Sequence, residues 1–420
     1  MKLVLLLLLV VVPTLCAQDW KALTDSARAD LAFLTSQSCK GRGYLPAGDR
    51  VAADYIRRVF RAHGVAPGVT ARDFDQPVSL RVHLFPATPQ VVLDGASLGC
   101  GAQFLPHPEC PAGGGATIPY RLMGDTAFPL ESPRGSVVII NEKLPEEVLR
   151  SLPEEERTLP ARIERMRLLG AVAVFVRVPR LVHSISENRL PIPVFMLDSA
   201  VPVRERGVID FNVADTSFLA ETSNIVGVIR GTRAPDSAVV VCAHYDHLGA
   251  LGDVYFPGAN DNASGTAMLL AMARSISRKP LPYTVVLLAT TGEEAGLHGS
   301  MAFVRNPPID LAKVRFLLNI DMTASGADGV MAQGGVENEA EFALLQRIAP
   351  RFGIDTVRKR ANSPNSDQYF FLRSGVRGFY LYPFAGLQPY HSINDRPETL
   401  EWNVWTRQGQ LVLALLRELE

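Results

Sequence analysis

Cysteine is scarce in this chain, with five residues among 420. So few thiols over this length exclude a disulfide framework as the organising principle of the fold. A surplus of charge of one sign is lacking too, because 42 basic residues nearly balance 43 acidic ones and leave a net charge of -1. A balanced chain gives no electrostatic argument for an acidic membrane surface or for nucleic acid. We therefore expect no nucleic-acid partner.

Long apolar runs are also missing, except for a short one at the start of the chain. A basic residue precedes the apolar run 3–12, and small residues follow near Ala17. This pattern predicts a secretory signal peptide over residues 1–17. The run is too short to span a bilayer, so we expect an exported protein, periplasmic or secreted, with no membrane span after signal cleavage. Cys16 raises the alternative of a lipoprotein, but the bulky Leu15 before it favours cleavage.

Four cysteines remain after that cleavage, and none has the spacing of a zinc-thiolate site. Cys100 and Cys110 flank a short loop containing glycine and proline, and they could pair in an oxidising compartment. Cys242 lies inside the apolar run 238–243, which predicts a buried free thiol.

The amino-acid composition changes along the chain and divides residues 18–420, which follow the predicted signal peptide, into three regions. Residues 18–75 include a helix expected from Asp49 to His63, where apolar positions follow a helical period. Residues 76–215 contain short β-rich runs broken by proline and glycine, which predict an inserted β-rich domain without a catalytic centre. We expect its three scattered histidines to be solvent-exposed or structural: His83, His107 and His183.

Residues 216–420 alternate between strand-like and helix-like segments. The expected strands cover residues 237–243, 283–289 and 314–320, and the expected helices cover 263–277 and 296–304. The strands are apolar on both faces, as in buried parallel or mixed sheets covered by helices. In such open sheets, sites form at the carboxyl ends of the strands.

Metal-ligand residues stand just after these strand ends. His244 ends an apolar run, and Asp246 two residues later can supply the carboxylate that orients a ligating imidazole. Asp261 lies in Gly258-Ala-Asn-Asp-Asn-Ala-Ser-Gly265, where an ordinary helix cap is the simpler interpretation. The polar pairs there exceed what capping needs, and a carboxylate with two oxygens can bridge two metal ions.

Carboxylates follow the next two strands as well. Glu293 and Glu294 come after an apolar run and a glycine. Because successive side chains diverge, one can ligate a metal while its neighbour reaches a metal-bound water. Asp321 ends a run so apolar that an unpaired carboxylate would be costly there. Further on, His391 lies in a loop before the C-terminal helix, and Tyr390 beside it can donate a hydrogen bond to an oxyanion.

With these motifs together, residues from about 224 to the C-terminus resemble the dinuclear zinc aminopeptidases of metallopeptidase family 28, clan MH. The resemblance rests on five stretches: Ala243-His-Tyr-Asp-His-Leu-Gly, Gly258-Ala-Asn-Asp-Asn-Ala-Ser-Gly, Thr291-Gly-Glu-Glu-Ala-Gly-Leu-His-Gly-Ser, Asn319-Ile-Asp-Met and Tyr390-His-Ser-Ile-Asn-Asp. It implies a three-layer α/β/α zinc-peptidase domain with a mixed, mostly parallel sheet. The insert over residues 76–215 more loosely resembles a protease-associated (PA) domain, and residues 18–75 and 216–420 then form the peptidase domain.

The resemblance also implies roles for single residues. One zinc ion would be held by His244, Asp321 and the bridging Asp261, and a second by Glu294, His391 and the same Asp261. Glu293 would be the general base, Asp246 the partner of His244, and Tyr390 the oxyanion donor. A cis peptide bond is expected after Asp261. His247 fits the family pattern without an assigned role, whereas Gln368 and His298 depart from it and concern substrate preference.

The implied activity is hydrolysis of N-terminal residues from peptide substrates, with two Zn²⁺ per chain and a bridging water. Carboxypeptidase, dipeptidase or glutaminyl cyclase activity on the same fold remains an alternative. A non-catalytic, receptor-like homologue is a further one, although such relatives normally lose metal ligands and this chain keeps all five.

Overall fold

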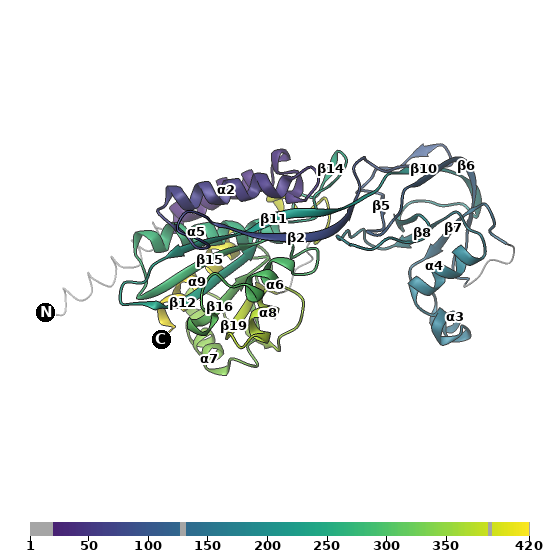
Figure 1. Cartoon of the computed structure of the whole chain (residues 1–420). Helices are drawn as coiled ribbons and strands as arrows, with labels where there is room; N and C mark the ends of the chain where they lie inside the picture. Colours follow the sequence, from purple (N-terminus) through teal and green to yellow (C-terminus); the bar gives the residue numbers. More distant parts are fainter. Residues whose placement is uncertain (1–19, 127–131, 385–388, 420) are drawn as a thin grey trace.

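The structure is a computed structural model that describes residues 20–126, 132–384 and 389–419. Two large β-sheets organise these residues, and the long strands β2 and β11 lead from the first sheet toward the second (Figure 1). The strands of the first, nine-stranded sheet are β1 (Ala66–Pro67), β2 (Asp75–Leu84), β11 (Thr216–Ile229), β12 (Ala234–His244), β15 (Tyr283–Thr290), β16 (Val314–Ile320), β17 (Val330–Gln333), β18 (Val357–Arg360) and β19 (Gly378–Pro383).

The first sheet is mixed, as expected. Its central strands run parallel in the order β15-β12-β16-β19. Antiparallel pairs flank this centre, with β11 on β15 at one side and β17 on β19 at the other. Parallel pairing is thus concentrated in the buried centre of the sheet, as in β15, whose residues are all buried.

Helices cover both faces of this sheet, so the predicted three layers are present (Figure 1). Because successive strand residues point to opposite faces, Val239 and Val241 of β12 pack in one core with α5, while Val240 and Cys242 pack in another with α6. The helices of this part include α2 (Gly48–Ala62), α5 (Gly265–Arg278), α6 (His298–Arg305), α7 (Glu339–Ile348), α8 (Gln368–Arg373) and α9 (Trp402–Glu418). The expected helices over 49–63, 263–277 and 296–304 correspond to α2, α5 and α6.

Residues between β2 and β11 form the second, eight-stranded sheet with its own apolar core. Its elements are β3 (Gln90–Leu93), β4 (Ala96–Ser97), β5 (Phe104–Pro106), β6 (Gly113–Leu122), β7 (Val137–Asn141), α3 (Glu146–Ser151), α4 (Leu159–Leu168), β8 (Ala173–Val178), β9 (Val194–Asp198) and β10 (Arg206–Val213). The predicted boundary at residue 76 places β2 inside the insert, whereas β2 pairs with β11 in the first sheet. The likeness to a PA domain stays a prediction.

Single predictions in this region have different outcomes. His83 and His183 are buried, with their side chains in contact with aromatic rings, so of the two expected environments the structural one applies to them. Cys100 and Cys110 are both free thiols here, and Cys242 is fully buried and free, as predicted. The signal-peptide prediction for residues 1–17 lies outside the described residues. Among the residues that are described, no helix is long and apolar enough to cross a membrane.

Candidate metal centre

Strand register brings the predicted site residues to one edge of the first sheet. In the parallel pairing, His244 at the end of β12 lies opposite Thr290 at the end of β15, and Cys242 lies opposite Asn319 of β16. Two residues further along, His244 and Asp321 are therefore neighbours. Because the carboxyl ends of parallel strands meet at one edge, the chain places its ligand candidates there.

His244 and His391 approach the same carboxylate from two sides. Nε2 of His244 lies 3.4 Å from Asp261 Oδ1 and 3.4 Å from Asp321 Oδ1. Nε2 of His391 lies 3.1 Å from Asp261 Oδ2 and 3.0 Å from Glu294 Oε2. Each oxygen of Asp261 thus faces a different imidazole, which is the placement that a bridging ligand requires.

Two groups of ligand atoms are compact enough to hold an ion. His244, Asp261 and Glu294 offer ligand atoms within 4.8 Å of one another, and so do His244, Glu293 and Asp321. All five predicted metal ligands and Glu293 are therefore brought together. Glu293 lies close enough to the ligands either to bind an ion or to act on a nearby water.

The loop that carries Asp261 is fixed by its backbone. The peptide bond between Asp261 and Asn262 is cis, as expected. The buried carboxylate of Asp395 accepts hydrogen bonds from the backbone N–H groups of Asn260, at 2.9 Å, and Asp261, at 3.0 Å. Asn262 donates from its side chain to the carbonyl of Ile320, at 3.1 Å, next to the ligand candidate Asp321.

Asp246 is placed differently from the expected carboxylate–imidazole pair. Nδ1 of His244 lies 3.2 Å from the backbone carbonyl oxygen of Asp246 but 3.7 Å from its carboxylate. The carboxylate instead accepts a hydrogen bond from Tyr44, at 2.8 Å, and another from the N–H of Glu293, at 3.4 Å. Asp246 therefore orients His244 through its backbone and connects the loops of His244 and Glu293 through its side chain.

Tyr390 lies at the rim of the site. Its ring stacks on His391 with centroids 3.7 Å apart, and 40 % of the residue is exposed. Arg180, from the insert, donates to its backbone carbonyl at 2.9 Å. The insert also reaches His391, whose Nδ1 lies 3.0 Å from the carbonyl oxygen of His183. Two segments far apart in the sequence thus orient one imidazole.

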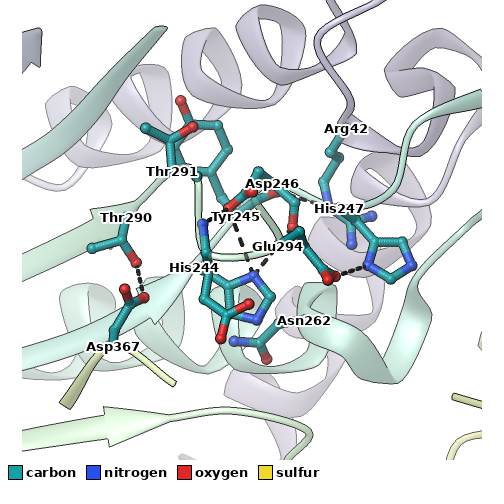
Figure 2. A network of polar contacts seen from close by, with 12 residues as sticks. Arg42, His244, Tyr245, Asp246, His247, Asn262, Thr290, Thr291, Glu294 and Asp367 are labelled. Atoms are coloured by element: carbon teal, nitrogen blue, oxygen red, sulfur yellow. Dashed lines mark hydrogen bonds and ion pairs between the residues drawn. The ribbon is translucent and has the colours of Figure 1, made fainter. Parts of the chain in front are cut away.

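Several residues near the site were given no role from the sequence. His247 is buried and its Nδ1 lies 2.5 Å from Glu294 Oε1, and Figure 2 shows the two side chains pointing at each other. Ser366 donates to Asp321 Oδ2 at 3.0 Å. Thr290 donates to Asp367, also in Figure 2. Ser366 and Asp367 are both fully buried, which explains why each has a hydrogen-bond partner, but nothing in the sequence shows that burial.

The two departures from the family pattern contact segments next to the site residues. The side-chain amide of Gln368 donates to the carbonyl of Ser363, at 3.0 Å, and its oxygen accepts from Asn319 at 3.4 Å. His298 is the first residue of α6, and its Cβ lies close to Gly292. Gln368 therefore holds its own loop in place.

The electrostatics of the site favour bound positive charge. Burial by itself lowers the pKa of His391, but Glu294 and then Asp261 raise it to about 11. Burial likewise opposes the charged form of His244, yet Glu293 and Asp321 raise its pKa well above the ordinary value. Burial raises the pKa of Glu294, but His391 lowers it to about 2. The carboxylates outnumber the imidazoles and attract cations.

One ligand candidate also has a buried oxygen atom that no hydrogen bond satisfies, as expected of an atom that binds a metal ion. Within the described part of the chain, the buried Oδ1 of Asp321 has no hydrogen-bond partner, although it points toward His244. A buried carboxylate oxygen without a partner is costly unless a cation satisfies it. Imidazole and carboxylate donors in this number suit zinc.

Comparison with known proteins identifies this part of the chain. Residues 224–416 match the sequence profile described as peptidase family M28. The chain carries a peptidase family M28 domain. All five predicted ligands lie within it, whereas Arg42 and Tyr44, which also contact the site, lie outside the matched residues.

Curated relatives match this chain over part of their own length. Aminopeptidase YwaD of Bacillus subtilis is 35% identical over 215 residues, which cover 48% of this chain and 46% of that protein. A probable zinc metalloprotease of Leptosphaeria maculans is 34% identical over 113 residues, or 26% of each chain. The matches thus span between about a quarter and half of these relatives.

Solved structures resemble the whole fold. BSAP, a zinc aminopeptidase from Bacillus subtilis, has a TM-score of 0.66 at 18% identity, with 94% of both chains covered. A peptidase M28 precursor from Shewanella amazonensis has a TM-score of 0.67 at 15% identity, with 95% of both chains covered. The M28 domain and the insert therefore form an arrangement that has been observed before.

Proposed function

We propose that this chain is a zinc-dependent aminopeptidase that binds two Zn²⁺ ions and removes N-terminal residues from peptides. One observation carries the proposal: the two oxygens of Asp261 face His244 and His391 separately, with Asp321 and Glu294 completing two adjacent sets of ligands. The peptidase profile over residues 224–416 and the aminopeptidase named among the relatives support it. Export of the mature protein remains part of the proposal.

The ligands divide between two positions. His244 and Asp321 would hold one ion, His391 and Glu294 the other, and Asp261 would bridge them. Bound zinc would supply Lewis-acid polarisation of the scissile carbonyl and lower the pKa of a water molecule. His247 fixes the orientation of Glu294 through the contact between Nδ1 and Oε1.

Glu293 is the proposed general base. Burial, followed by the neighbouring charge of Glu294, raises its pKa well above the ordinary value, although His244 opposes this shift. A carboxylate with a raised pKa accepts a proton from the attacking water more readily and can return it to the leaving amine nitrogen. The carboxylate of Asp246 accepts a hydrogen bond from the backbone N–H of Glu293 and so helps to fix the position of the Glu293 backbone.

Tyr390 is the proposed oxyanion donor. Its stacking on His391 keeps the phenol at the rim of the ligand cluster, and its partial exposure leaves it open to a substrate. A hydroxyl at this place can donate a hydrogen bond to the oxygen that becomes negative during attack on the carbonyl.

Hydrolysis of matched substrates tests the proposal. The same aminoacyl amide is offered with a free and with an acetylated amino group, with and without a chelator. We expect turnover of the free-amine substrate alone, its loss on chelation and its return with Zn²⁺. Faster cleavage of the acetylated substrate, or of a free C-terminal residue, would contradict an aminopeptidase and favour a carboxypeptidase.

A further inference from the structure

A segment outside the M28 domain reaches the site from the N-terminal part of the chain. We call residues 37–44, which comprise the short helix η1 (Gln37–Arg42), Gly43 and Tyr44, the strap. Arg42 in this strap is fully buried and has a positive φ of 51°. Its guanidinium forms hydrogen bonds with backbone carbonyls and with no carboxylate side chain among the described residues. A buried cation held in this way needs an explanation.

Four of the five carbonyls that bind Arg42 flank the ligand candidates, and the fifth belongs to Leu34, at 3.1 Å. Nε of Arg42 donates to Tyr245, directly after His244, at 2.8 Å. The other nitrogens donate to Pro257 at 2.7 Å, to Gly258 at 2.7 Å and to Asp261 itself at 3.2 Å. One side chain thus joins the two loops that carry His244 and Asp261, with five N–H donors in a fixed planar geometry. A lysine cannot reproduce this set.

Glycines allow the strap to lie directly against the His244 loop. A Cβ added to Gly43 would lie 2.3 Å from the Cα of Gly249, and a Cβ added to Gly41 would lie 2.4 Å from the carbonyl oxygen of Gly249. Neither position has room for a side chain. The Gly-Arg-Gly sequence therefore combines a long donor side chain with backbone contact on either side of it.

Tyr44 reaches the other half of the site. Its hydroxyl donates to Asp246 Oδ2 at 2.8 Å and accepts a hydrogen bond from the N–H of Gly292 at 3.0 Å. Asp246 in turn accepts from His244 Nδ1 through its backbone and from Glu293 N–H through its carboxylate. Tyr44 therefore connects the loop that carries His244 with the loop that carries Glu293.

We propose that the strap is a positioning element of the metal centre, in which Arg42 sets the spacing of the His244 and Asp261 loops and Tyr44 aligns Asp246 with Glu293. This inference rests on the proposed metallopeptidase function. Both residues are buried, so we expect them to act through the residues that they hold. Residues that orient ligands from outside typically change metal affinity or activity about 10-fold to 100-fold when they are replaced.

Two substitutions in the full-length protein test the strap. Tyr44→Phe removes one hydroxyl, and Arg42→Lys keeps the charge but loses the planar set of donors. We expect both variants to bind zinc about 10-fold to 100-fold more weakly in competition with a chelator of known affinity. We also expect Tyr44→Phe to lower kcat with an unchanged KM, because the base is displaced while the substrate contacts remain.

Tyr55→Phe is the matched control. It removes a tyrosine hydroxyl that donates to a buried carboxylate, Asp30, at 2.7 Å, away from the metal centre. We expect it to change thermal stability and to leave zinc affinity and kcat as in the wild type. If Tyr44→Phe behaves like Tyr55→Phe in both measurements, the strap proposal is wrong.

The zinc titration separates this inference from the proposed function. A wild type that binds zinc but cleaves no aminoacyl substrate would refute the aminopeptidase, and weaker zinc binding by Tyr44→Phe would still support the strap. Normal cleavage with equal zinc affinity and kcat in the variant would refute the strap alone. If Arg42→Lys does not fold, the zinc affinity and kcat of Tyr44→Phe alone test the strap proposal.

Discussion

Asp49, at the start of α2, provides a quantitative test of how burial acts near the strap. The residue is 2% exposed, and burial raises the pKa of its carboxyl from the ordinary value of 3.8 to about 6, although hydrogen bonds from Thr222 and the backbone of Arg50 oppose the shift. The folded state therefore holds this proton more tightly than the unfolded state. Replacement of Asp49 with asparagine removes the titration and keeps the size of the side chain.

The sign follows from proton linkage. Between about pH 4 and pH 6 the unfolded chain has lost the proton and the folded chain has kept it, so the free energy of unfolding falls as the pH rises. A shift of roughly two pKa units corresponds to about 3 kcal/mol, and the full loss is present above pH 6. Asp49→Asn does not suffer this loss. The variant should therefore gain up to about 3 kcal/mol over the wild type as the pH rises from 4 to 7.

Urea unfolding followed by tryptophan fluorescence measures this difference. The chain has three tryptophans, Trp20, Trp402 and Trp405, and none lies in the second sheet, so the signal reports the unfolding of the first one. The exposed Asp25→Asn serves as the control, with an expected change within about 0.5 kcal/mol at every pH. A difference between Asp49→Asn and wild type that stays constant from pH 4 to pH 7 would refute the reasoning.

Two further substitutions follow from single contacts. Ser366→Ala removes the hydrogen bond to Asp321 Oδ2 and should weaken zinc binding about tenfold in a chelator competition. Ser363→Ala, in the same loop without a contact to Asp321, should leave zinc binding unchanged. Trp405→Ala empties a fully buried site and removes the donor to the Ser264 carbonyl, so circular dichroism in urea should show a loss of about 3–5 kcal/mol. A loss under 1 kcal/mol would contradict this packing.

The sequence predicted the first sheet well because its strands carry a strong local signal. The segments 237–243, 283–289 and 314–320 are mostly apolar, with runs that point apolar side chains to both faces, and β12, β15 and β16 occupy them with small changes at their ends. The boundary of the insert was harder to place. β2 alternates buried and exposed residues as an edge strand of either sheet would, and only its pairing with β11 assigns it.

The ligand candidates were predictable because each follows a strand end or lies in a recognisable loop. The strap was not. Arg42 and Tyr44 lie some 200 residues before their partners in the chain, and nothing local shows that an arginine between two glycines binds carbonyls. The sequence also did not show that the Asp246 carboxylate binds Tyr44. The distance between the Asp246 carboxylate and His244 depends on how the loop after β12 turns.

The Glu293→Gln variant tests the central claim most directly, by measuring zinc content and kcat on a free-amine substrate in the same preparation. Glutamine keeps the size of the side chain but cannot accept the proton. We expect the zinc content of the wild type, an unchanged fold and a kcat lower by about 10²-fold to 10⁴-fold. A variant that loses zinc would show that Glu293 is a ligand, as its position beside His244 and Asp321 also permits. A variant that keeps both zinc and wild-type turnover would contradict the account.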